Sequence, residues 1–157
     1  MYRTAEDFAA DWAASAAGTM AVMKSITDDK KDFAIVEGHS SLGWLAWHLT
    51  STASAFGRIA GMNVPAIERG AQAPESVADI AAKYEEISEA CKNEAAKLSD
   101  EQMAEEIDAL GGRMFRGKLL RLLVEHQAHH RGQMTVLLRQ AGLPVPGVMG
   151  PTIEMKK

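Results

Sequence analysis

Residues 117–141 read GKLLRLLVEHQAHHRGQMTVLLRQA, and this stretch decides the fold class. One stripe recurs along it at steps of three or four positions and comprises Leu119, Leu123, His126, His130, Met134 and Leu137. Such spacing turns one face of an α-helix toward a core. Gly142 follows the last turn, and Pro144 prevents continuation. We therefore predict a long helix with histidines at positions that leucine or methionine would fill in an ordinary bundle.

Three further segments have the same helical period, and they cover residues 4–25, about 40–61 and about 75–98. Thr4 can cap the first of them, and either Ser40 or Ser41 can cap the second. Four helices of about 20 residues each can enclose one core. The sequence therefore predicts an all-α four-helix bundle in a single domain, residues 1–157.

The connections between these helices are long. The segment GMNVPAIERGAQAPES, residues 61–76, is rich in glycine and proline and predicts a long loop. Long crossover connections are thus expected, and simple up-down-up-down order is not required. Before the last helix, Ser99 can start a short helical turn, and the pair Gly111–Gly112 can close a small hairpin.

Composition narrows the class of protein. The hydrophobic fraction of 46% is typical of a globular chain, and a net charge of −4 does not suggest a nucleic-acid-binding surface. The N-terminus has no signal-peptide pattern, and no apolar run is long enough for a membrane span. Cys91 stands alone, so we expect a reducing cytoplasm and a cysteine that packs within a helix.

The histidines of the last helix carry the functional signal. His126 and His130 are spaced i, i+4, which places their Cβ atoms about 5–6 Å apart. That spacing suits one divalent metal. Taken alone it is a weak signal, because each imidazole could be satisfied by a backbone carbonyl or a buried hydroxyl instead.

His48 strengthens the metal interpretation. It lies on an inward-facing stripe with Leu45 and Thr52, flanked by Trp44 and Phe56. Burying an imidazole without partners costs a few kcal/mol. One metal therefore explains three such residues more simply than three separate hydrogen-bond arrangements. Neutral imidazole suits zinc, nickel or iron, and three protein ligands with open positions are typical of a catalytic metal.

Two other histidines have weaker claims. His129 lies about 100° around the helix from His130, so it could replace His130 as a ligand, orient a ligand or face the surface. The stripe favours His130. His39 precedes the second helix and is expected in an exposed loop.

Two blocks, GWLAWHLT (43–50) and LLVEHQAHHRGQMTVLLRQAGLPVPGVMGP (122–151), resemble the DinB-like family. Its superfamily includes bacillithiol and related thiol S-transferases and mycothiol-dependent maleylpyruvate isomerase. The resemblance implies a bundle with crossed connections, a homodimer, and a divalent metal bound by His48, His126 and His130. Nickel and zinc are the usual metals, with iron a third candidate. Many relatives have tyrosine where this chain has Met149, which puts any reaction that uses the phenol in doubt.

Such a metal could lower the pKa of a bound water from about 16 toward about 7, or hold a low-molecular-weight thiol as thiolate. Three hypotheses follow: a metal-dependent thiol S-transferase or hydrolase acting on a small electrophile, a non-catalytic metal- or ligand-binding stress protein, and a helical interaction protein whose histidines are merely buried.

Arg131 is a candidate contact for an anionic substrate, and Glu125 is expected to be a solvated or interface charge. Gly132, inside the helix, suggests close approach of another helix, such as at a dimer contact.

Overall fold

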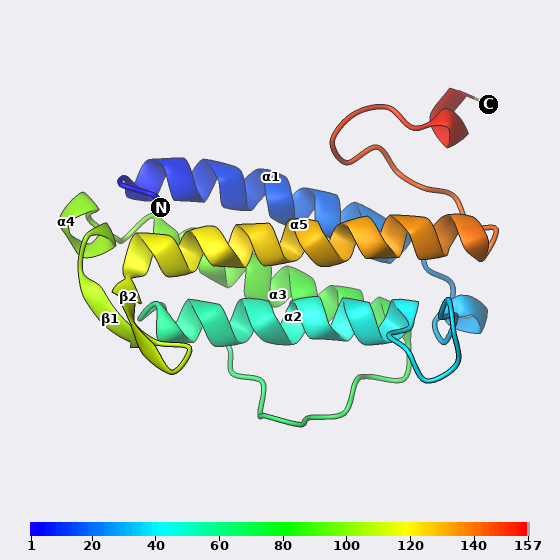
Figure 1. Cartoon of the computed structure of the whole chain (residues 1–157), viewed down its shortest axis with the longest axis horizontal. Helices are drawn as coiled ribbons and strands as arrows, with labels where there is room; N and C mark the ends of the chain where they lie inside the picture. Colours follow the sequence, from blue (N-terminus) through cyan, green and yellow to red (C-terminus); the bar gives the residue numbers. More distant parts are fainter. Residues whose placement is uncertain (157) are drawn as a thin grey trace.

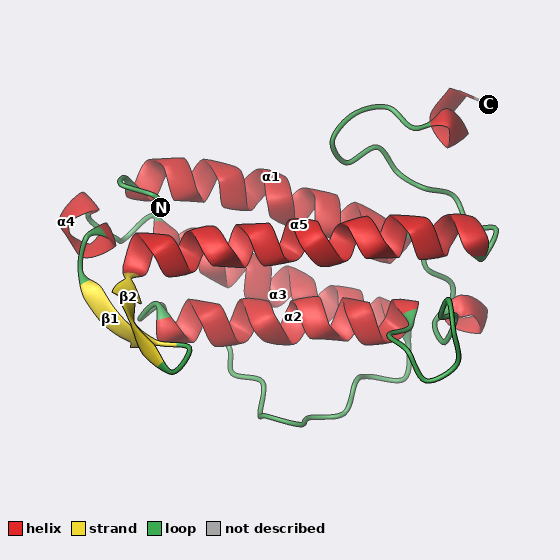
Figure 2. Cartoon of the chain, viewed as in Figure 1, coloured by secondary structure: helices red, strands yellow, loops and turns green. Residues whose placement is uncertain are grey.

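Four long helices form the bundle in the computed structural model, which describes residues 1–156. They are α1 (Ala5–Lys24), α2 (Leu42–Ile59), α3 (Val77–Ala95) and α5 (Arg116–Gln140). A short helix, α4 (Asp100–Met103), and a hairpin of β1 (Glu106–Ala109) and β2 (Gly112–Phe115) precede α5, and two 3₁₀ turns cover Asp28–Lys30 and Ile153–Lys156. Figure 2 shows the hairpin at one end of an otherwise helical molecule. The predicted all-α four-helix class is confirmed.

The helices are not connected in simple up-down order. α1 and α2 occupy opposite corners, and each packs against both α3 and α5. α1 and α5 run in one direction and α2 and α3 in the other, so the chain between α2 and α3 must return along the length of the bundle (Figure 1). The predicted long crossover is this connection. Within residues 1–156, none of the helices combines the length and the apolar character that crossing a bilayer requires.

Side-chain caps fix where the helices begin. The Thr4 hydroxyl accepts from the Asp7 N–H, and the Ser41 hydroxyl accepts from the Trp44 N–H, so both predicted caps are confirmed. α3 is shorter than predicted, because Ser76 caps it and it ends at Ala95. A capping box at Ser99 confirms the short turn before the hairpin.

The hairpin turn differs in detail from the prediction. Ala109 pairs with Gly112, so the two-residue loop is Leu110–Gly111 and not the glycine pair. Leu110 has φ 53° and Gly111 has φ 84°. Two successive residues with positive φ are typical of the tight turn that matches the twist of a two-stranded ribbon. Gly112 instead belongs to the second strand.

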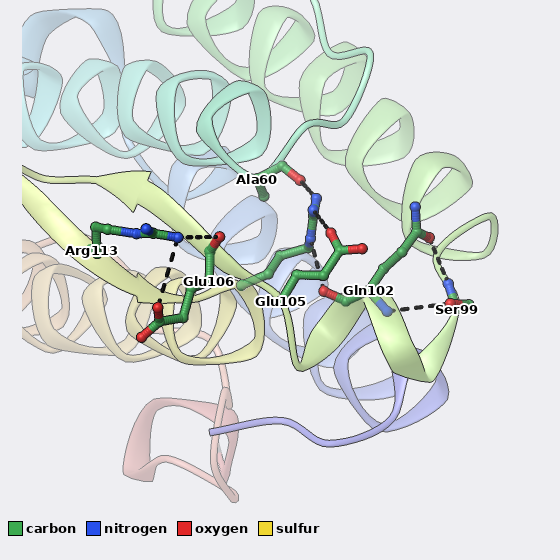
Figure 3. A network of polar contacts seen from close by, with 7 residues as sticks. Ala60, Ser99, Gln102, Glu105, Glu106 and Arg113 are labelled. Atoms are coloured by element: carbon green, nitrogen blue, oxygen red, sulfur yellow. Dashed lines mark hydrogen bonds and ion pairs between the residues drawn. The ribbon is translucent and has the colours of Figure 1, made fainter.

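Arg116 connects the elements at the hairpin end of the bundle by hydrogen bonds. It is buried, and its guanidinium donates to the carbonyl oxygens of Gln102 and Ala60 and to the Glu105 carboxylate, at 3.0, 2.5 and 2.6 Å. Figure 3 shows Ala60, Gln102 and Glu105 converging at this point, beside the Ser99 capping box and the surface pair of Arg113 with Glu106. The buried cation therefore joins α2, α4 and α5.

The buried stripe of α5 corrects the sequence prediction. Its fully buried residues include Leu123, Gln127 and Met134, and Arg131 is 6% exposed, whereas His126 and His130 are only half-buried. The helix is thus rotated so that polar residues occupy core positions and the histidines lie at the edge. Spacing along the chain predicts the histidines in the core, but spacing does not specify the rotation of the helix about its own axis.

Gln127 is the polar centre of the core. Its Oε1 accepts from the hydroxyls of Thr19 (3.1 Å) and Tyr84 (3.0 Å), and its Nε2 donates to the Leu49 carbonyl (3.1 Å). These partners belong to α1, α3 and α2 respectively. One side chain from α5 therefore binds all three other helices. Burial raises the pKa of Tyr84, which keeps its hydroxyl protonated as a donor.

Gly117 and Gly132 provide a matched pair of stability predictions. A Cβ on Gly117 would lie 2.0 Å from the Tyr2 carbonyl oxygen, whereas a Cβ on Gly132 would meet nothing within 4 Å. We expect Gly117→Ala to lower the free energy of unfolding by about 1–3 kcal/mol through this clash. Gly132→Ala should raise it by up to about 1 kcal/mol through helix propensity. Urea denaturation of both variants checks the pair, and equal effects would contradict the packing of Tyr2 against α5.

Candidate metal centre

Three imidazoles converge where α2 faces α5. His48 comes from α2, and His126 and His130 come from successive turns of α5. One ring nitrogen from each residue lies within 4.8 Å of the other two. The Nε2 atoms of His48 and His126 are 3.1 Å apart, and the ring centroids lie 4.4–4.9 Å from one another. The fold therefore brings together the three histidines that the sequence singled out.

The spacing of these nitrogens fits a divalent metal. Metal–nitrogen bonds of about 2.0–2.1 Å at 90–110° separate neighbouring ligand atoms by about 2.9–3.4 Å. The 3.1 Å between His48 and His126 lies in that range, and the ligand nitrogens of all three residues lie within 4.8 Å of one another.

The alternative explanation, buried histidines with separate hydrogen bonds, does not fit the contacts of His126. His126 Nδ1 is buried and has no hydrogen-bond partner among residues 1–156. The polar contact of its ring is with His48. An imidazole retained for its own hydrogen bonds would have a carbonyl or hydroxyl partner. The rings instead face one another.

Burial and neighbouring charge keep His48 and His126 in the form that binds metal. Burial, and then the neighbouring histidines, lower the pKa of His126 to about 4. Burial, followed by His130, lowers the pKa of His48 as well. Both rings are therefore neutral at pH 7. A neutral imidazole has the free lone pair that a metal requires, and few protons compete for it.

Gln133 lies on the outer side of the cluster, and the sequence alone did not assign it a role. Its Oε1 lies 2.8 Å from His130 Nδ1, and its Nε2 lies 3.2 Å from His129 Nε2. An amide oxygen only accepts, so it places the proton of His130 on Nδ1 and leaves Nε2 free to bind a metal. The i, i+3 spacing from His130 was the available signal. His129 is exposed and lies outside the three-nitrogen cluster.

Replacing Gln133 with alanine should weaken metal affinity by about 10–100-fold, because His130 loses the partner that fixes its orientation. Isothermal titration with nickel and zinc measures the effect. Gln140→Ala is the matched control, since Gln140 is an exposed glutamine at the end of the same helix. Equal affinities for the two variants would remove Gln133 from the site.

Aromatic side chains line both ends of the cluster. Trp44 stacks on His48, with centroids 4.7 Å apart and an interplanar angle of 11°, and remains 51% exposed. Phe56 lies 6.0 Å from His126 on the other side. Rings packed in this way limit rotation of the histidines, and the exposed indole provides an apolar surface beside them.

Arg131 lies away from the cluster, contrary to its expected role beside the histidines. Its Nη1 donates to the Ser15 carbonyl (2.9 Å), the Ser15 hydroxyl (3.1 Å) and the Thr19 hydroxyl (3.1 Å) on α1. The histidines face α2, at the opposite corner of the bundle. Met149 also lies away from the histidines, beside Arg131 on the other face of α5, so the missing tyrosine leaves the cluster unchanged.

The remaining sequence candidates have structural positions. Glu125 pairs with Arg121 at 2.7 Å on the surface, as a solvated charge. His39 is exposed, as predicted. Cys91 is buried and free, and burial raises the pKa of its thiol to about 12, so it is a packing residue. Gly132 is not approached by another helix of the chain, which corrects that part of its interpretation.

Comparison with known proteins agrees with this fold. The sequence model of the DinB family matches residues 1–156. The chain belongs to the DinB family. It is 35% identical over 155 residues to the uncharacterized protein YrdA of Bacillus subtilis (strain 168), an alignment that covers 98% of this chain and 93% of YrdA.

Two solved structures show the DinB fold in similar proteins. A DinB-like protein from Bacillus cereus ATCC 10987 superposes with a TM-score of 0.83 at 33% identity, covering 94% of this chain and 99% of that one. The DinB-like protein YjoA of Bacillus subtilis gives 0.74 at 22% identity, with 93% and 99% covered, and supports the fold alone. The three-histidine group of this DinB protein could hold a metal ion.

Proposed function

We propose that this DinB protein binds one nickel or zinc ion, with iron a third candidate, through His48, His126 and His130. We further propose that it is a metal-dependent thiol S-transferase or hydrolase acting on a small electrophile. The observation that carries the proposal is the convergence of three ring nitrogens from two helices. Among residues 1–156 the cluster contains no carboxylate or thiol as a fourth ligand. Three protein ligands are typical of catalytic sites and four of structural ones.

A divalent metal held by neutral imidazoles would supply a Lewis acid that lowers the pKa of a thiol or a water. Neighbouring residues of the chain orient the histidine rings. Gln133 sets the tautomer of His130, and Trp44 fixes the plane of His48 while leaving half of its indole exposed. That apolar surface suits the body of a small hydrophobic electrophile.

A non-catalytic metal- or ligand-binding role is the second candidate. It is favoured by one observation: within the part of the chain that the structure describes, no carboxylate or thiol joins the three histidines to act as an acid or base beside them. Efficient proton transfer normally needs a group positioned at the reacting atoms. We also propose that the protein uses a low-molecular-weight thiol or another small-molecule substrate, forms a homodimer and is located in the cytoplasm.

The test begins with untagged protein, whose metal content is measured by elemental analysis. The metal-loaded and chelator-treated forms are then assayed with low-molecular-weight thiols against epoxides and haloaromatics, and for hydrolysis of activated esters. Metal-dependent product supports the enzyme. Bound metal without turnover across the panel would support the binding role. Metal-free protein whose melting temperature does not change with nickel or zinc would reject both.

A further inference from the structure

The C-terminal tail forms a groove on the face of α5 opposite the histidines. After α5 the chain turns back toward α1 (Figure 1). A Cβ on Gly18 of α1 would lie 2.6 Å from Val148, so the tail is seated closely on that helix. Between the tail and α5 lies a cavity of about 410 Å³, lined by residues that include Arg131, Gly132, Thr135, Val145, Pro146 and Val148. This volume is suitable for a small organic ligand.

Arg131 brings an uncompensated positive charge to this groove. The side chain is 6% exposed, and its partners on α1 are neutral: a carbonyl and two hydroxyls. Within residues 1–156 it forms no ion pair with a carboxylate, whereas Arg139 at the same groove is paired with Glu154 at 2.8 Å. Buried cations in proteins are normally paired, because removing a charge from water is costly.

The guanidinium has an unused edge of the right shape for a carboxylate. All three of its hydrogen bonds come from Nη1, and neither Nε nor Nη2 has a partner among the residues that the structure describes. The N–H groups of Nε and Nη2 point in parallel from one side of the planar group. Two parallel donors match the two oxygens of a carboxylate.

Gly132 keeps the wall of the groove open. It lies in the interior of α5, where glycine weakens a helix relative to alanine. No neighbouring atom of the chain would meet a Cβ at this position, so packing within the chain does not require glycine. A side chain here would project into the groove beside Arg131.

We propose that this groove binds a small organic carboxylate. The carboxylate receives two hydrogen bonds from the Nε and Nη2 edge of Arg131, and a short apolar chain or ring lies against Val145, Pro146 and Val148. The apolar wall favours an organic acid over an inorganic anion. The site is independent of the metal centre, because it faces α1 and the tail whereas the histidines face α2.

The test uses the full chain labelled with ¹⁵N-arginine and titrated with butyrate and benzoate at constant ionic strength. The Nε–H resonance of Arg131, assigned from the spectrum of Arg131→Lys, should shift and saturate with both acids. Butanamide, which has the same apolar chain and no charge, should leave it unchanged. Calorimetry gives the affinities in parallel.

Gly132→Leu and Gly132→Ala form the matched pair. Leucine adds a large side chain to the groove beside Arg131, so affinity for benzoate should fall about tenfold or more, while alanine should retain it. A resonance that does not respond to either acid, or equal benzoate affinity in the two variants, would overturn the proposal. So would a wild-type dimer that Gly132→Leu converts to a monomer, since the groove would then be an interface between copies.

Discussion

Replacing His126 with alanine is expected to leave purified protein without its metal. Wild-type protein should carry about one divalent ion per chain. His126 is the central ligand, because its Nε2 lies 3.1 Å from that of His48 and its ring lies 4.4 Å from that of His130. Its removal leaves two imidazoles on different helices. Loss of an outer-shell partner can lower metal affinity about 100-fold. Loss of the ligand His126 should lower it further.

Elemental analysis and thermal melting measure this effect. At a free metal concentration of about 100 times Kd, binding should stabilise the wild type by about 2.7 kcal/mol. The variant should show no such gain. His39→Ala is the matched control, since His39 is an exposed histidine outside the cluster. Comparing His129→Ala with His130→Ala identifies the third ligand: the first should retain metal, the second should lose it. A His126→Ala variant that still binds metal stoichiometrically would exclude this centre.

Replacing Gln127 with alanine is expected to destabilise the core strongly. The substitution leaves the hydroxyls of Thr19 and Tyr84 without their acceptor and opens a cavity where four helices meet. Each unsatisfied buried group costs about 1–3 kcal/mol. We expect a loss of about 3 kcal/mol in the free energy of unfolding, or roughly 6–12 °C in Tm for a domain of this length.

Two comparisons separate the causes. Gln127→Leu retains most of the volume and removes the hydrogen bonds, so a similar loss would assign the effect to the polar network, and a much smaller loss would assign it to the cavity. Gln140→Ala makes the same change at an exposed position of α5 and should stay within about 0.5 kcal/mol of the wild type. If Gln127→Ala were equally mild, Gln127 would not be the residue that joins the helices.

Local signals in the sequence determined most of the secondary structure. Thr4 and Ser41 are caps because their hydroxyls satisfy N–H groups three residues onward. The end of α5 at Gln140, before Gly142 and Pro144, follows from neighbours along the chain as well. The hairpin was expected, but its turn was displaced by one residue. Strand pairing selected Leu110–Gly111, which a glycine pair does not specify.

The candidate site was determined in part. The spacing of His126 and His130 fixes both rings on one side of one helix, whatever the helix packs against. Periodicity gives the angle between side chains on a helix but not the rotation of that helix about its own axis. His126 and Gln127 are adjacent and differ by about 100°, so a modest rotation exchanges which of them is buried. The fold buried Gln127 and placed the histidines at the edge.

What the sequence by itself determined is therefore local: four helices, most of their ends, and three histidines suited to one metal. The tertiary structure decided which helix each side chain faces. It directed Arg131 toward α1, brought His48 of α2 to the histidines of α5, and placed the tail on the side of α5 away from the histidines. The physical reason is that hydrogen bonds between distant segments depend on the relative positions of whole helices, and those positions come from the packing of the entire core.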